Sequence, residues 1–132
     1  MKKFARSSLS LLLLLSMFVT SIGAVQATQI EPRYTGVARI SSHLTISENG
    51  AATCGGSAIL RSGYTADLTV ELKRDGTTIK TWVTSGSTFL TISETYYVTP
   101  GHTYVVTTTV TVYDSNGKIV ESPSIDSREK QY

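Results

Sequence analysis

The sequence predicts an all-β protein folded as an antiparallel sandwich of about seven strands. Apolar and polar residues alternate with a period of two over most of the chain, and β-branched and aromatic residues predominate there. Glycine-rich turn signals recur about every eight to twelve residues, and no stretch between them has a helical period. A small closed barrel is the alternative architecture that this pattern allows.

The first half of the domain contains three predicted strands. Residues 36–46 alternate cleanly, and Asn49-Gly50 then supplies the positive φ angles of a tight hairpin. The second strand, 52–60, carries small residues around Gly55-Gly56, which indicates either a close approach of the two layers or a β-bulge. After a loop, residues 68–73 place Leu and Val on one face and Thr, Glu and Lys on the other.

The Asp75-Gly76 hairpin leads into a fourth strand at 78–84. Ile79 and Trp82 lie on it with opposite parity, so a regular strand cannot bury both side chains on one face. We therefore expect a bulge, or a Trp82 side chain that packs across an edge. A fifth strand follows at 89–98.

The longest alternating run, 103–113, is the strand around which the domain is organised. One face carries a tyrosine and valines and is expected to be buried. The other carries threonines, which keep an exposed sheet soluble or, alternatively, form a hydroxyl surface for a polymer or ordered water. Pro100-Gly101 turns the chain before this strand, Asn116-Gly117 forms the hairpin to a seventh strand at 118–122, and Pro123 ends the pairing.

These elements divide the chain into a signal peptide at 1–27, a lead-in at 28–35, the sandwich domain at 36–122 and a flexible tail at 123–132. Basic residues precede an apolar run of signal-peptide length, with cleavage expected after Ala27 and an uncleaved anchor as the alternative. The mature chain then has 12 − 3 = 9 basic and 10 acidic residues. The mature chain is therefore expected to offer no basic surface for nucleic acid. It is also expected to have no membrane span, because the apolar run belongs to the signal peptide.

The turn at Pro100 and Gly101, followed by Tyr104, resembles the E–F corner of immunoglobulin-like and fibronectin type III domains. The resemblance implies an immunoglobulin-like sandwich in which the Tyr104 hydroxyl hydrogen-bonds back to the corner. Two departures separate the chain from antibody-type domains: Val106 stands where the second cysteine would lie, and Trp82 lies on the fourth strand instead of the third.

The motifs P-R-Y-T-G, A-T-C-G-G-S, R-S-G-Y-T-A-D and T-P-G-H-T-Y occur in this order along the mature chain. Together they resemble a family of short secreted proteins from Gram-positive, clostridia-like bacteria. The resemblance implies a secreted or extracellular protein, released or held on the cell wall, and implies no activity.

Few residues point to chemistry. His43, His102 and Cys54 fall on separate elements, so no metal site is predicted, and the chain lacks nucleophile-elbow, zinc-hydrolase and phosphate-loop motifs. We expect no cofactor and no enzymatic activity, with a small secreted hydrolase as the least favoured alternative because triads assemble in space. Cys54 is expected to be a small buried residue; an intermolecular disulfide or a reactive thiol is the alternative.

Tyrosines at strand ends and in loops are the binding candidates: Tyr64, Tyr96, Tyr97 and Tyr113. Their rings combine contact area with a polar group, which suits both sugars and proteins. The sequence thus predicts a secreted, non-catalytic module for an envelope or extracellular protein or glycan. The alternative is a self-associating structural subunit of the cell surface, joined by an exposed edge strand or by Cys54.

Overall fold

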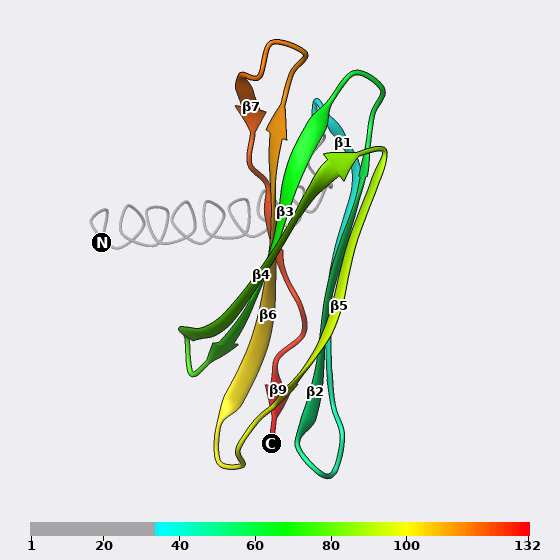
Figure 1. Cartoon of the computed structure of the whole chain (residues 1–132). Coiled ribbons are helices and arrows are strands. Elements are labelled where there is room, and N and C mark those ends of the chain that lie inside the picture. Colours follow the sequence, from blue (N-terminus) through cyan, green and yellow to red (C-terminus); the bar gives the residue numbers. More distant parts are fainter. Residues whose placement is uncertain (1–33) are drawn as a thin grey trace, which may run out of the picture. The chain divides into compact units, whose positions relative to one another are not determined.

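Two antiparallel sheets lie face to face in the computed structural model, which describes residues 34–132 (Figure 1). The expected signal peptide and residues 28–33 of the expected lead-in lie outside the described residues. Within 34–132 the secondary structure consists of strands, with no helix. The predicted all-β sandwich is confirmed, with nine strands in place of about seven, and the closed barrel is wrong.

The smaller sheet has the order β1-β2-β5, and the larger has the order β4-β3-β6-β7, with β8 and β9 also paired to β6. Matched in chain order, these are the A-B-E and C′-C-F-G sheets of an immunoglobulin-like sandwich. The strands are β1 (Val37–Ile46), β2 (Ala51–Leu60), β3 (Thr65–Arg74), β4 (Thr77–Ser87), β5 (Phe89–Tyr97), β6 (Thr103–Tyr113), β7 (Ile119–Glu121), β8 (Ser124–Asp126) and β9 (Lys130–Gln131).

The core lies between the sheets and follows the alternation of the sequence. Leu68, Val70 and Leu72 of β3 are fully buried, whereas their neighbours in the strand are partly exposed. Burial of each such side chain contributes about 1.5–3 kcal/mol. In β6 the inward face continues this layer with Tyr104, valines and Thr108.

The Gly55-Gly56 step is a close approach of the two sheets and not a bulge. The β1–β2 and β2–β5 registers run through both glycines without a shift. A Cβ on Gly56 would lie 2.7 Å from Thr108 Cγ2 and 2.8 Å from Val70 Cγ2. Only glycine therefore lets β2 pass this close to β3 and β6.

Both expectations for the fourth strand are met. The β3–β4 register shifts by one residue between Leu72 and Lys73, so Ile79 is the extra residue of a bulge. Beyond the bulge, the Trp82 ring packs in an edge-to-face arrangement against the Tyr96 ring of the smaller sheet, with the ring centroids 6.5 Å apart. Trp82 and Tyr96 thus close the side of the sandwich between β4 and β5.

The expectation of a flexible tail at 123–132 is wrong. Residues of β8 and β9 pair with β6, and the Ser127 N–H donates to the Val106 carbonyl oxygen at 2.8 Å. At the end of this segment, Tyr132 donates its N–H to the His102 carbonyl and its hydroxyl to the Glu48 carbonyl. Together, β7, β8 and β9 therefore form one interrupted edge strand.

The corner before β6 has the predicted geometry. The Tyr104 side chain is fully buried, and its hydroxyl donates to the Thr99 carbonyl oxygen at 2.6 Å. Because Pro100 and Gly101 lie between these two residues in the chain, the bond closes the turn over the end of the sandwich.

Cys54 is buried within β2, and burial raises the pKa of its thiol to about 11. Its sulfur faces the core, where a second chain cannot reach it without opening the fold. The interpretation as a small buried residue is confirmed, and a disulfide-linked assembly through Cys54 does not fit the folded domain.

No helix of the described residues is long and apolar enough to cross a membrane.

Candidate functional site

The four candidate tyrosines do not form one surface. Tyr113 pairs with Thr65, the residue after Tyr64, so these two tyrosines lie at the end that carries the β2–β3 and β6–β7 loops. Tyr96 and Tyr97 pair with β2 beside the β1–β2 turn, at the opposite end (Figure 1). A single tyrosine patch is therefore ruled out.

Two of these tyrosines are committed to internal contacts at the first end. The Tyr113 hydroxyl donates to Asp67 Oδ2 at 2.9 Å, which raises the pKa of Tyr113. Ser85 donates to the other oxygen of the same carboxylate, and the Ser85 and Tyr113 bonds together lower the pKa of Asp67. The Tyr64 ring packs over Gly36 and the core.

Tyr96 is likewise engaged with Trp82, which leaves Tyr97 as the exposed member of the four. Its side chain is 71% exposed. Phe89, at the other end of the same strand and on the same outer face, is 56% exposed. These two aromatic residues therefore stand at the two ends of β5.

The β5 edge is an open row of backbone hydrogen-bonding groups. Val98 N–H donates to the Gly50 carbonyl, and Leu60 N–H donates to the Thr88 carbonyl, each at 2.8 Å. Between these two bonds the β2–β5 register has no shift. In an antiparallel ladder, hydrogen-bonded residue pairs alternate with pairs that are not hydrogen-bonded. Even-numbered residues of β5 therefore bond to β2, and the odd-numbered ones direct their groups outward. We call this row the β5 edge: Phe89, Thr91, Ser93, Thr95 and Tyr97.

Each of the other edges of the sandwich is interrupted in at least one place, and in β1 the register with β2 shifts between Val37 and Arg39. The β4 edge carries the Ile79 bulge and Lys80, and Pro123 interrupts the edge formed by β7, β8 and β9. The Glu121 carboxylate accepts the N–H groups of residues 35–37 at the start of β1. By contrast, β5 contains no proline, lysine or bulge along nine residues.

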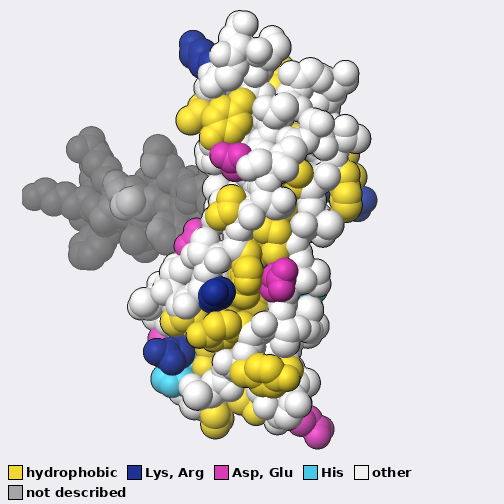
Figure 2. All heavy atoms as spheres, viewed as in Figure 1, with side chains coloured by type: hydrophobic (Ala, Val, Ile, Leu, Met, Phe, Trp, Pro, Cys, Tyr) yellow, Lys and Arg dark blue, Asp and Glu magenta, His cyan; other side chains and the backbone are white. Residues whose placement is uncertain are grey.

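Figure 2 views the side of the sandwich where β4 and β5 lie. It shows hydrophobic side chains in a strip along this side, with single charged side chains among them. Trp82 and Tyr96 are partly buried against the core here. The β5 edge therefore borders an apolar surface.

The outward threonines of β6 are occupied within the sheet. Thr107 donates to Asp126, Thr109 bonds to Ser124, and Thr111 bonds to the Ser122 hydroxyl at 3.2 Å. These bonds fasten the interrupted edge strand to β6. The hydroxyls are therefore structural and are not a free array for a polymer or for ordered water.

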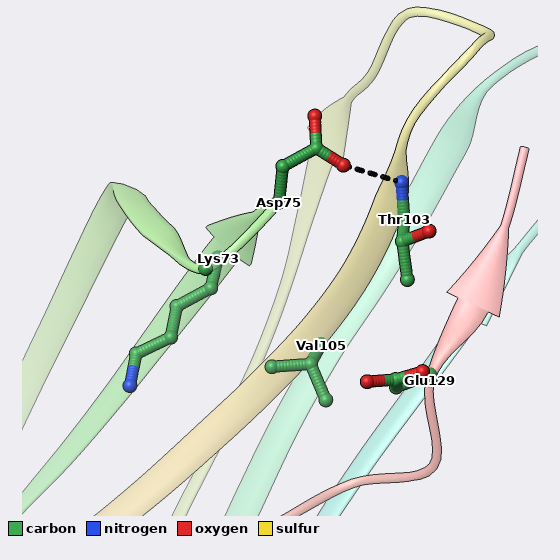
Figure 3. Close-up of a pocket in the computed structure, with 6 residues that line it drawn as sticks. Lys73, Asp75, Thr103, Val105 and Glu129 are labelled. Atoms are coloured by element: carbon green, nitrogen blue, oxygen red, sulfur yellow. Dashed lines mark hydrogen bonds between the residues drawn. The ribbon is translucent and has the colours of Figure 1, made fainter.

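A hollow of about 380 Å³ lies beside the β3–β4 turn (Figure 3). His102 Nδ1 lies 2.6 Å from Asp75 Oδ2, and the Thr103 N–H donates to Asp75 Oδ1 at 3.0 Å. Asp75 has a φ of 50°, which the Asp-Gly turn permits and which directs the carboxylate toward the corner before β6. Lys73, Asp75, Gly76, Thr103, Val105 and Glu129 line the hollow.

The Asp75–His102 pair is a feature that sequence reasoning missed, since the sequence places Asp75 in a hairpin and His102 far from it in the chain. The aspartate can orient the imidazole, as in a catalytic triad. Within residues 34–132, no hydroxyl or thiol side chain is hydrogen-bonded to His102, and no three metal-ligand side chains gather. The pair therefore links two turns and has the Asp–His part of a triad without a bonded nucleophile.

Acid should weaken this link. The Thr103 N–H, then His102, hold the pKa of Asp75 below its ordinary 3.8, so the folded state favours the carboxylate. The stabilisation is complete above the ordinary pKa and is lost as pH falls through the lowered one. We expect Asp75→Asn to lower the Tm near neutral pH by a few degrees, and we expect this difference from wild type to shrink as the pH falls below 3.8 and to vanish once the carboxyl is protonated in the folded state. Thermal melts across pH measure this, with Glu129→Gln on the same hollow as the control; a difference that persisted in acid would contradict it.

Neither end of the sandwich, nor the hollow, presents a complete catalytic or metal-binding arrangement among the described residues. The β5 edge, with Phe89 and Tyr97 at its ends, is the surface whose geometry most directly suits a partner. Comparison of the chain with protein-family models and with curated proteins finds no match.

Proposed function

We propose that this chain is a secreted, non-catalytic interaction module that binds an extracellular protein partner along the β5 edge. The unprotected row of outward backbone groups on β5 is the observation that carries the proposal. Extended peptides bind such edges by main-chain hydrogen bonds, and side-chain contacts add specificity. The signal-peptide pattern and the resemblance to short secreted Gram-positive proteins support an extracellular location, free or on the cell wall.

A protein partner fits this surface better than a glycan. Phe89 and Tyr97 are eight residues apart, or about 26 Å along a strand. That span is too long for the two rings to stack on neighbouring sugars, whereas strand addition uses the whole length between them. The residues between them on the outer face are Thr91, Ser93 and Thr95, which are short and uncharged.

A small secreted hydrolase is the second candidate, and the Asp75–His102 pair beside the hollow is the observation that favours it. An oriented imidazole could act as a general base on water. His102→Ala should abolish any hydrolysis of ester or peptide substrates by the purified protein, while Glu94→Gln, on β5 and away from the hollow, should leave it unchanged.

A partition experiment tests the proposed function. Labelled protein is added to washed Gram-positive cells and to isolated cell wall, and the bound fraction is measured against protein concentration. We expect saturable retention, lowered at least about tenfold by Ser93→Pro, because proline removes an outward N–H and no bond to β2. Thr45→Ala, at an exposed position of β1 on the opposite edge of the same sheet, is the control and should bind as wild type. Complete recovery of the wild type in the supernatant would contradict the proposal, and so would retention of Ser93→Pro equal to that of the wild type.

A further inference from the structure

We propose that a second copy of this chain is the partner, paired antiparallel through β5 about a two-fold axis at Ser93. This inference rests on the proposed function, since it names the occupant of the same β5 edge. The resulting dimer would join the two smaller sheets into one six-stranded sheet with the order β1-β2-β5-β5-β2-β1.

The backbone of β5 suits this pairing along its whole length. Antiparallel pairs exchange both hydrogen bonds between residues directly opposite each other. Because the outward residues of β5 are the odd-numbered ones, a two-fold axis at Ser93 places outward groups opposite outward groups throughout. Phe89 then faces Tyr97 of the second copy, Thr91 faces its Thr95, and all nine residues of the strand are paired.

The side chains of β5 are symmetric about the same point. The two exposed aromatic residues, Phe89 and Tyr97, lie four residues before and four residues after Ser93. The dimer therefore makes two identical Phe–Tyr pairs on the outer face, where aromatic cross-strand pairs stabilise a sheet. Only hydroxyl side chains lie between these pairs, so no charge on that face opposes the contact.

Glu94 helps to select this register. An axis at Glu94 would place the two carboxylates directly opposite each other, which is destabilising. An axis at Ile92 would pair Phe89 with Thr95 and leave Tyr97 opposite residue 87, beyond the end of β5. With the axis at Ser93, each Glu94 faces Ile92 and the two carboxylates are only diagonal neighbours, so Glu94→Gln should strengthen the dimer severalfold.

The size of the contact indicates a weak dimer. The four rings at the two ends bury at most about 500 Å² of their exposed surface, and the strand edges add their backbone groups. This is below the roughly 1,200 Å² at which stable interfaces begin. We therefore expect a reversible dimer with a dissociation constant in the micromolar-to-millimolar range.

Cysteine crosslinking of the full-length chain, purified from a secreting host, tests the pairing. Under mild oxidation Ser93→Cys should give a disulfide-linked dimer, because the two residues lie opposite each other, whereas buried Cys54 stays reduced. Thr91→Cys alone should not crosslink, since its two copies are about 13 Å apart along the strand. A mixture of Thr91→Cys with Thr95→Cys should crosslink. Equal crosslinking of Ser93→Cys and of Thr91→Cys alone would overturn the register.

Sedimentation equilibrium up to about millimolar protein gives an independent measurement. The wild type should shift from monomer to dimer with concentration, and Ser93→Pro should stay monomeric with an unchanged Tm. A wild type that stays monomeric throughout overturns the dimer; if Ser93→Pro still loses retention on cells, the proposed function stands with a different partner. A dimer sensitive to Ser93→Pro without retention on cells supports this inference and removes the envelope role.

Discussion

Tyr104→Ala is expected to lower the free energy of unfolding by about 3–5 kcal/mol, the usual cost of truncating a buried aromatic side chain. The ring is fully buried at the end of the core, and its hydroxyl bonds to the Thr99 carbonyl. Since domains of this kind are stable by about 5–15 kcal/mol in total, the variant should unfold at a much lower urea concentration. Equilibrium denaturation followed by intrinsic fluorescence measures the difference.

Tyr104→Phe separates the two contributions of this residue. It keeps the ring in the core and removes only the 2.6 Å bond to Thr99. The Thr99 carbonyl that loses its partner belongs to an exposed residue and can bond to water, so we expect a cost of about 0.5–1.5 kcal/mol, clearly smaller than that of alanine. If phenylalanine had no effect, the hydroxyl bond would not hold the corner; if it matched alanine, the ring packing would not matter.

The strands were predictable because their signals are local. Alternation placed the inward face of β3 and β6, the Asp75-Gly76 and Asn116-Gly117 steps placed two hairpins, and the parity of Ile79 and Trp82 predicted the bulge. Each of these signals depends on neighbours within a few residues. Even the corner bond of Tyr104 spans only five residues.

The pairing of residues 123–132 could not be predicted in the same way. This segment is short, polar and interrupted by Pro123, so its own pattern is typical of a tail. Distant partners hold it: the Val110 N–H donates to the Pro123 carbonyl at 2.9 Å, and the Ser124 and Asp126 side chains bond to threonines of β6. Such contacts depend on the order of strands in the sheet, which the local sequence does not specify.

The candidate sites also depend on the order of the strands in the sheets. Nothing in the residues of β5 states that this strand lies at an edge, because a strand with the same alternation could lie in the middle of a sheet. The Asp75–His102 pair joins two turns that are 27 residues apart in the chain. Tyr64 and Tyr97 could be predicted to lie at strand ends. Only the topology shows that they lie at opposite ends of the sandwich.

Gly56→Ala is expected to lower the free energy of unfolding by about 1–3 kcal/mol, although alanine normally favours a strand over glycine. The added methyl group would point into the core and press on Thr108 and Val70, both fully buried and both belonging to the opposite sheet. Neither neighbour has free space to retreat, since the packing there is that of a closed interior. Chemical denaturation of the purified variant measures the loss.

Gly55→Ala is the matched control, one residue away on the same strand and facing outward. Its methyl group would meet the His43 ring, which is exposed and can rotate into solvent. We therefore expect its stability to change by less than about 0.5 kcal/mol. Equal losses at both glycines would show that the backbone of β2 itself cannot accept a side chain. A loss confined to Gly56 would show that the distance between the sheets sets the limit, and Thr108→Ala should then relieve it.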